Sequence, residues 1–242
     1  MNVADIRSEF VRKYRASEFV TDKTGVKMLE IVGASFIADE NFIFGKPNED
    51  YIKRELEWYK SQSLNVYQIP PPVPKIWQKV ATPDGRINSN YGYLMYSAEN
   101  GSQFSGVVSA LLEHRDTRRA VAIYTRPTMH TDFNRDGMSD FICTNAVSYL
   151  IRDDKLHAVV QMRSNDSWAG FRNDIAWQRT VLEEVAACYN GLATRTGKDV
   201  TPVTVGTIKW QVASLHLYES QFKLIEEFIE GAKEAAMKKV YN

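Results

Sequence analysis

The sequence predicts an α+β fold, formed by a single domain that spans residues 1–242. Segments with helical periodicity are interspersed with clustered strands, without the regular strand–helix alternation that produces a doubly wound parallel sheet. No internal repeat, low-complexity tract or convincing linker divides the chain. A chain of 242 residues is also long enough to bury a sizeable core.

Helical periodicity marks five segments of the chain. In each of them, apolar residues recur at intervals of three or four, as they do on one face of an amphipathic helix. Asn48 begins the second segment and has a side chain suited to capping it. The predicted helices cover residues 3–14, 48–64, 102–114, 175–192 and 218–239.

Runs of β-branched and apolar residues predict five strands. Gly33 interrupts the first strand, which indicates a bend or bulge there. Asp153 and Asp154 separate the third and fourth strands and predict a hairpin turn. Four prolines within residues 70–74 favour a rigid extended spacer over a ligand for a recognition domain. The predicted strands cover residues 27–38, 119–125, 144–151, 155–162 and 201–212.

The composition excludes several classes of protein. Lysine plus arginine and aspartate plus glutamate number 30 each, and this zero net charge argues against a general DNA or RNA coat. No apolar run approaches the roughly 18 residues that a membrane span needs. Residues 1–15 lack the apolar stretch of a secretory leader, and the two cysteines do not make a disulfide framework. We therefore expect a cytoplasmic protein that binds neither membranes nor nucleic acids directly.

Residues 132–143 match the first half of a calcium-binding loop. Oxygen-bearing side chains alternate from Asp132 to Asp136, and Gly137 holds the sixth position. The twelfth position should supply a bidentate glutamate, but it is Cys143. The pattern therefore favours a solvated acidic turn. The four histidines show no ligand spacing, so we expect no metal site.

Cys143 and a set of arginines are the candidate functional residues. Cys143 begins an apolar strand, where a cysteine is either a small buried hydrophobe or, with Arg163 or Arg119 nearby, a nucleophile of lowered pKa. Arg118 and Arg119 form either an exposed pair or a phosphate clamp. Four polar side chains end a strand at residues 163–166. From the residues alone, the interpretation stops at a phosphate-bearing small ligand, with covalent chemistry at Cys143 left open.

An ordered series of short motifs along the chain indicates a protein family. The chain resembles the thymidylate synthase superfamily and, within it, the phage enzymes that hydroxymethylate deoxycytidylate. The resemblance implies a mixed sheet packed with helices and an obligate homodimer, formed sheet to sheet, whose active sites are shared between chains. The motifs are DKTG (22–25), RELEWY (54–59), NYG (90–92), DTRR (116–119), FICTN (141–145), RSND (163–166), GFRND (170–174) and LHLY (215–218).

Site residues follow from the resemblance one by one. Cys143 matches the nucleophile that adds to C6 of the pyrimidine, with its pKa lowered by arginine neighbours, and Glu55 matches the general acid–base glutamate. Asp174 stands where synthases read uracil with asparagine. The phosphate, sugar and remaining substrate positions are matched by Lys23, Arg163, Ser164, Asn165, His216 and Tyr218, with Arg118 and Arg119 from the partner chain, and the base and folate region by Trp77, Tyr91, Asp166 and Gly170.

Two departures from the synthase pattern stand out. The synthase cysteine lies between proline and histidine, whereas Cys143 lies between Ile142 and Thr144. Residues 128–140 are longer and more acidic than the matching synthase segment. The phage hydroxymethylases share that insertion.

Asp174 favours cytosine over uracil. Cytosine presents a bare N3 and a donating 4-amino group, and negative charge flows toward N3 when a thiolate adds to C6. A carboxylate beside N3 can hold the proton there and accept from the amino group, in a bidentate charge-assisted pair. Against uracil, a carboxylate oxygen would face the O4 acceptor, at a cost of about 1–3 kcal/mol or more.

The resemblance thus implies transfer of a one-carbon unit from 5,10-methylenetetrahydrofolate to C5 of dCMP. Water then gives 5-hydroxymethyl-dCMP and tetrahydrofolate. The residues alone leave the terminal step open between water and hydride. The alternatives are a synthase-type methylase or hydroxymethylase acting on dUMP, and a non-enzymatic nucleotide-binding or calcium-dependent module.

Overall fold

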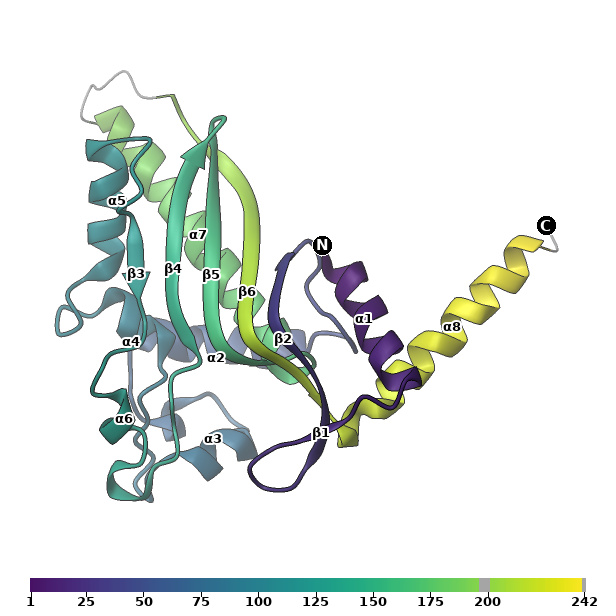
Figure 1. Ribbon diagram of the computed structural model, residues 1–242. Helices are drawn as coiled ribbons and strands as arrows, with labels where there is room; N and C mark the ends of the chain where they lie inside the picture. The colour runs from purple at the N-terminus through teal and green to yellow at the C-terminus, as the bar shows by residue number, and fades with distance from the viewer. Residues whose placement is uncertain (196–200, 241–242) are drawn as a thin grey trace.

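The computed structural model describes residues 1–195 and 201–240 and is built on a six-stranded mixed sheet (Figure 1). The strand order is β1-β2-β6-β5-β4-β3, in which β5 and β6 are parallel and the other neighbours antiparallel. This arrangement confirms the α+β prediction. The strands are β1 (Val20–Thr21), β2 (Lys27–Ile37), β3 (Val121–Ile123), β4 (Thr144–Arg152), β5 (Lys155–Asp166) and β6 (Thr204–Tyr218).

Helices cover one face of the sheet. The long α7 packs on β5 and β6, with α2 and α5 against it, and α1 packs on β2 beside α8 (Figure 1). None of the helices within the described part of the chain is long and apolar enough to cross a membrane. The helices are α1 (Val3–Arg15), α2 (Glu49–Ser61), α3 (Lys75–Val80), α4 (Tyr91–Tyr96), α5 (Gln103–Glu113), α6 (Met129–Asp132), α7 (Ala169–Arg195) and α8 (Phe222–Val240), with short 3-10 turns η1 (Val66–Gln68), η2 (Arg135–Gly137) and η3 (Glu219–Gln221).

The predicted hairpin is confirmed and fixes the register of the sheet. Asp153 and Asp154 both have positive φ, 50° and 56°, as a two-residue turn between twisted strands requires. The pairing that follows places Thr144 opposite Met162. The residue before β4, Cys143, is therefore brought alongside the end of β5.

The predicted bend at Gly33 is also confirmed, and it extends across the sheet. Gly33 has a φ of +69°. Leu29 and Phe36 are both buried although their positions differ by seven, which would place them on opposite faces of a regular strand, so β2 exchanges faces at the glycine. A matching switch occurs in β5 between Met162 and Asn165, which are both buried. The exchange turns Asn165 toward the helix-covered face, beneath the start of α7.

All five predicted helices form, but α7, β5 and β6 are longer than predicted, and β5 continues to Asp166, past the expected end at residue 162. α7 begins at Ala169 because the Asp166 carboxylate accepts from the main-chain N–H groups of Trp168 (2.7 Å) and Ala169 (2.8 Å). β6 continues to Tyr218, past the expected end at residue 212. The extensions of α7, β5 and β6 bring polar residues to the same end of the sheet.

Candidate active site

Cys143 lies directly before β4 and is fixed to β5 by Arg163. The Arg163 guanidinium donates to the carbonyl oxygens of Phe141 (2.6 Å) and Ile142 (3.0 Å). Its Nη2 also lies 3.5 Å from the Cys143 Sγ. The fold therefore brings together the cysteine and one of the two arginines that the sequence offered as its partners.

Burial controls the protonation of this thiol. The pKa of Cys143 is raised to about 11, mainly by burial; Arg163 lowers the pKa, whereas Asp174 and Asp140 raise it. Arg163 thus lowers the pKa of the thiol as expected, but the net pKa within the single chain is raised rather than lowered. One guanidinium reaches the sulfur, and burial with two carboxyl groups outweighs it. The thiol is protonated at neutral pH.

Asp174 projects from the N-terminal part of α7 to the end of β5. Its Oδ2 accepts from the Asn165 Nδ2 at 2.7 Å, and the Trp210 indole N–H, 3.2 Å from the Asn165 Oδ1, fixes the orientation of that amide. Burial first, and then the charge of Glu55, raise the pKa of Asp174 well above its usual range; Asn165 lowers it. Burial therefore favours the protonated form of Asp174.

Glu55, on α2, is 5% exposed. Its Oε1 accepts from the Tyr51 hydroxyl and from the Trp77 indole N–H at 3.2 Å. Burial raises the pKa of Glu55 to about 7, against the lowering effect of these two hydrogen bonds. A carboxyl group with that pKa gives and takes protons readily at neutral pH. Tyr51 was not among the residues predicted for the site, although it stands one helical turn before Glu55 on the same face.

Gly170 allows α7 to begin close against β5. A Cβ atom at Gly170 would lie 3.0 Å from the Asn165 Nδ2, 3.4 Å from the Asp166 Cβ and 3.6 Å from the Asp174 Oδ2. The missing side chain thus lets the first turn of α7 pack tightly against the end of β5.

Tyr91 completes the inner wall of the site. Its hydroxyl lies 3.0 Å from the Thr144 Oγ1, next to Cys143, and its ring stacks on Tyr59 with centroids 5.4 Å apart. Burial raises the pKa of Tyr91 well above its usual range, with further contributions from Asp174 and Cys143. Tyr91 therefore lies beside both of these groups.

The residues predicted to bind the sugar and the phosphate lie at the end of β6 and in neighbouring parts of the sheet. The rings of His216 and Tyr218 are 5.0 Å apart at the end of β6. The pKa of Tyr218 is raised by burial and then by Asp22, Asp166 and Cys143, so Tyr218 is close to the reactive end. Lys23 follows Asp22 in the exposed turn between β1 and β2, and Ser164 pairs with β6 at Ser214.

Arg118 and Arg119 do not join this cluster within one chain. Both are exposed and precede β3. The neighbouring Ala120 accepts a hydrogen bond from the main chain of Tyr149, near the opposite end of β4 from Cys143. At about 3.3 Å per residue, the two arginines lie about 20 Å along the strand from the cysteine.

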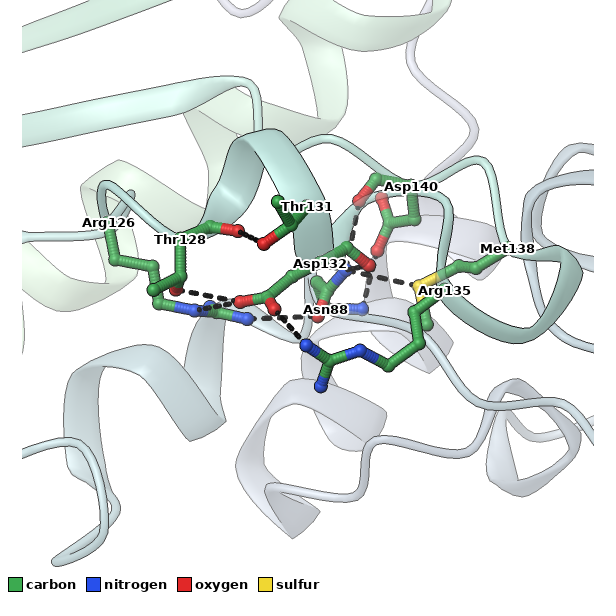
Figure 2. Close-up of polar contacts among 8 residues, drawn as sticks. All are labelled: Asn88, Arg126, Thr128, Thr131, Asp132, Arg135, Met138 and Asp140. Atoms are coloured by element: carbon green, nitrogen blue, oxygen red, sulfur yellow. Dashed lines mark hydrogen bonds and ion pairs between the residues drawn. The ribbon is translucent and has the colours of Figure 1, made fainter.

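The acidic insertion is held by internal contacts rather than open to a cation (Figure 2). The Asp132 carboxylate pairs with Arg126 and with Arg135, at 2.9 Å each. The Asp140 carboxylate is buried and accepts from the main-chain N–H of Asn88 at 2.6 Å. Within the described ranges, no group of three or more His, Cys, Asp or Glu side chains is arranged to hold a metal ion.

Comparison with known proteins gives the same picture over most of the chain. Residues 20–240 match the profile of the thymidylate synthase family. Deoxycytidylate 5-hydroxymethyltransferase of Enterobacteria phage T2 is 51% identical over 242 residues, which cover 100% of this chain and 96% of the relative. The protein of that name from Enterobacteria phage T4 is 50% identical over 241 residues, with the same coverage. A putative thymidylate synthase of Methanocaldococcus jannaschii is 28% identical over 134 residues, 55% of each chain.

Proposed function

The chain belongs to the thymidylate synthase family, and from this premise we propose that it hydroxymethylates deoxycytidylate. The reaction transfers a one-carbon unit from 5,10-methylenetetrahydrofolate to C5 of dCMP and yields 5-hydroxymethyl-dCMP and tetrahydrofolate. Relatives of about half identity over the whole chain carry the name of that activity. Since these relatives come from phages, we further propose that the protein acts in the cytoplasm of an infected bacterium.

The buried carboxyl of Asp174 is the structural observation that carries the proposal. In its neutral form Asp174 donates to the bare N3 of cytosine, and its other oxygen accepts from the 4-amino group. When Cys143 adds to C6, the proton moves to N3 and neutralises the charge that develops in the ring. The hydrogen bond from Asn165 then stabilises the carboxylate that remains.

Cys143 and Glu55 carry the covalent steps. Since burial keeps the Cys143 thiol protonated, the thiol must give up its proton as the nucleotide binds, with Arg163 stabilising the thiolate. Methylenetetrahydrofolate, the cosubstrate of the family, supplies the one-carbon unit. Glu55 accepts the proton from C5 and releases it as tetrahydrofolate leaves, so that its carboxylate can then accept a proton from the water that completes the product.

The family resemblance supports a folate site near the start of α7, where Gly170 packs against Asn165 and Asp166. We assign Trp77, Tyr91, Asp166 and Gly170 to the cosubstrate, and the 3′-hydroxyl to His216 and Tyr218. The phosphate is assigned to Lys23, Arg163 and Ser164, with Asn165 at the base.

The position of Arg118 and Arg119, away from the rest of the site, supports the proposal of a homodimer with shared sites. In Figure 1, no described helix covers the face of β4, β5 and β6 that is turned toward the viewer. Exposed apolar side chains lie on β2 and β3, including Val32 (79%) and Ile123 (58%). Packing of two such faces would bury these side chains and bring each arginine pair to the partner's nucleotide.

Tritium release from C5 of labelled dCMP and dUMP, with methylenetetrahydrofolate present, tests the proposal. We expect release from dCMP, little release from dUMP, and no rise in the near-ultraviolet absorbance that accompanies dihydrofolate. An absorbance rise would indicate methylation instead. Equal turnover of the two nucleotides would refute the role of Asp174 in selecting cytosine.

A further inference from the structure

We propose that Tyr51 is a positioning residue for Glu55. Its hydroxyl, together with the Trp77 indole, holds the Oε1 atom of Glu55 and leaves Oε2 as the oxygen that exchanges protons with the reacting groups. The inference rests on the proposed function, in which Glu55 is the general base. It assigns a role to a residue that the family resemblance did not supply.

The three side chains form a closed set of contacts. The Tyr51 hydroxyl and the Glu55 Oε1 are hydrogen-bonded within α2. The Trp77 Nε1 on α3 lies 2.9 Å from the Tyr51 hydroxyl oxygen and 3.2 Å from the Glu55 Oε1. Each group therefore touches the other two, and the carboxyl group cannot rotate without breaking two hydrogen bonds.

The proline-rich spacer explains how Trp77 reaches α2. Arg54 donates through its Nη1 to the carbonyl oxygens of Pro70 and Pro72, both at 2.8 Å. This contact ties the spacer to the helix turn that carries Glu55. The Trp77 ring then packs against Trp58, with centroids 5.2 Å apart. The position of the indole N–H is thus set by α2 itself.

The direction of donation is fixed by the chemistry of the donors. The indole N–H of tryptophan can donate a hydrogen bond but cannot accept one. The pKa of Tyr51 is raised by burial and by Glu55, so its hydroxyl keeps its proton and donates it. The other titratable groups near Glu55 among the described residues are Tyr59 on α2 and Asp174 on α7, and burial raises the pKa of both. Tyr51 and Trp77 are therefore the two groups that favour the carboxylate form.

The carboxylate form is the one that the addition of water requires. The water oxygen bonds to the exocyclic methylene carbon on C5, and one water proton goes to Glu55. The electron pair of the exocyclic double bond enters the ring, the C5–C6 double bond re-forms, and the Cys143 thiolate leaves C6. Without the Tyr51 hydroxyl, burial would keep more of Glu55 protonated and unable to accept that proton.

The test compares Tyr51→Phe with Tyr14→Phe. The control removes the same kind of bond, from Tyr14 on α1 to Glu226 on α8, away from the site. The rate of 5-hydroxymethyl-dCMP formation is measured from pH 5.5 to 9.5. We expect Tyr51→Phe to raise the pKa of the acidic limb by about one unit, the size expected for a charge-assisted hydrogen bond. At pH 7 kcat then falls about fivefold, and it recovers above pH 9, with KM for dCMP changed less than about twofold. Tyr14→Phe should retain the wild-type profile.

A purely structural role gives a different result. If Tyr51→Phe loses activity equally at all pH values, or retains the wild-type profile, the inference is wrong. A wild-type protein that makes no 5-hydroxymethyl-dCMP would instead overturn the proposed function. In that case carbon NMR titration of the Glu55 carboxyl, assigned with Glu55→Gln, still decides whether Tyr51→Phe raises its pKa. An unchanged pKa would overturn the inference by itself.

Discussion

Replacement of Glu55 by glutamine should stabilise the folded protein at neutral and alkaline pH while abolishing turnover. Burial raises the pKa of Glu55 from its ordinary 4.5 to about 7. Below pH 4.5 both the folded and the unfolded chain hold this proton, so the carboxyl group costs no stability. Between pH 4.5 and 7 the unfolded chain releases the proton and the folded chain keeps it. The free energy of unfolding therefore falls by about 1.4 kcal/mol per pH unit, to a total of about 3 kcal/mol above pH 7.

Glutamine removes this loss because its amide does not ionise, and its oxygen still accepts from Tyr51 and Trp77. Urea unfolding of Glu55→Gln and wild type at equal protein concentration, from pH 4 to pH 9, measures the difference. We expect a gain of about 3 kcal/mol at pH 8, or roughly 6–12 °C in Tm, and less than about 1 kcal/mol at pH 4.5. Glu57→Gln is the matched control, since Glu57 is exposed on the same helix. A stability difference that does not change with pH would refute the reasoning.

Three further predictions follow from the site. Asp174→Asn should lower turnover of dCMP and raise turnover of dUMP in the tritium-release assay; unchanged dCMP turnover would contradict its role as base reader. Alkylation of Cys143 by iodoacetamide, followed by mass spectrometry, should accelerate up to an apparent pKa of about 11, whereas a plateau below pH 9 would contradict the effect of burial. Co-refolding inactive Cys143→Ser with inactive Arg119→Ala should restore about a quarter of wild-type activity per site, because about half the dimers are mixed and each holds one intact site. Mixed dimers that form but show no activity would place the arginine pair in its own subunit.

Much of the fold follows from local sequence, because helices and strands with one buried face carry their own periodicity. The hairpin and the bend at Gly33 were predictable because positive φ favours Asp and Gly. The true end of β6 could not be predicted, because the strand exchanges faces near residue 213 and this breaks the alternation on which a strand prediction relies. The start of α7 depends on the carboxylate of Asp166, which caps the helix from the end of the preceding strand. The local sequence around Asp166 indicates a strand end and not a helix cap.

The sequence predicted which residues form the site better than it predicted their protonation. Motif order named Cys143, Glu55 and Asp174, but the pKa of each depends on how deeply the fold buries it. Charge alone suggested a lowered pKa for Cys143, and burial reverses it. Tyr51 carries no motif signal, and its contact with Trp77 joins residues 26 positions apart. Such contacts exist only once α3 has packed on α2.

Water, and not hydride, should complete the reaction on dCMP. The direct measurement is mass spectrometry of the nucleotide formed from dCMP and methylenetetrahydrofolate in water enriched in oxygen-18. We expect 5-hydroxymethyl-dCMP that carries one heavy oxygen in its hydroxymethyl group, with tetrahydrofolate as the second product. A 5-methyl nucleotide without heavy oxygen, formed together with dihydrofolate, would contradict it.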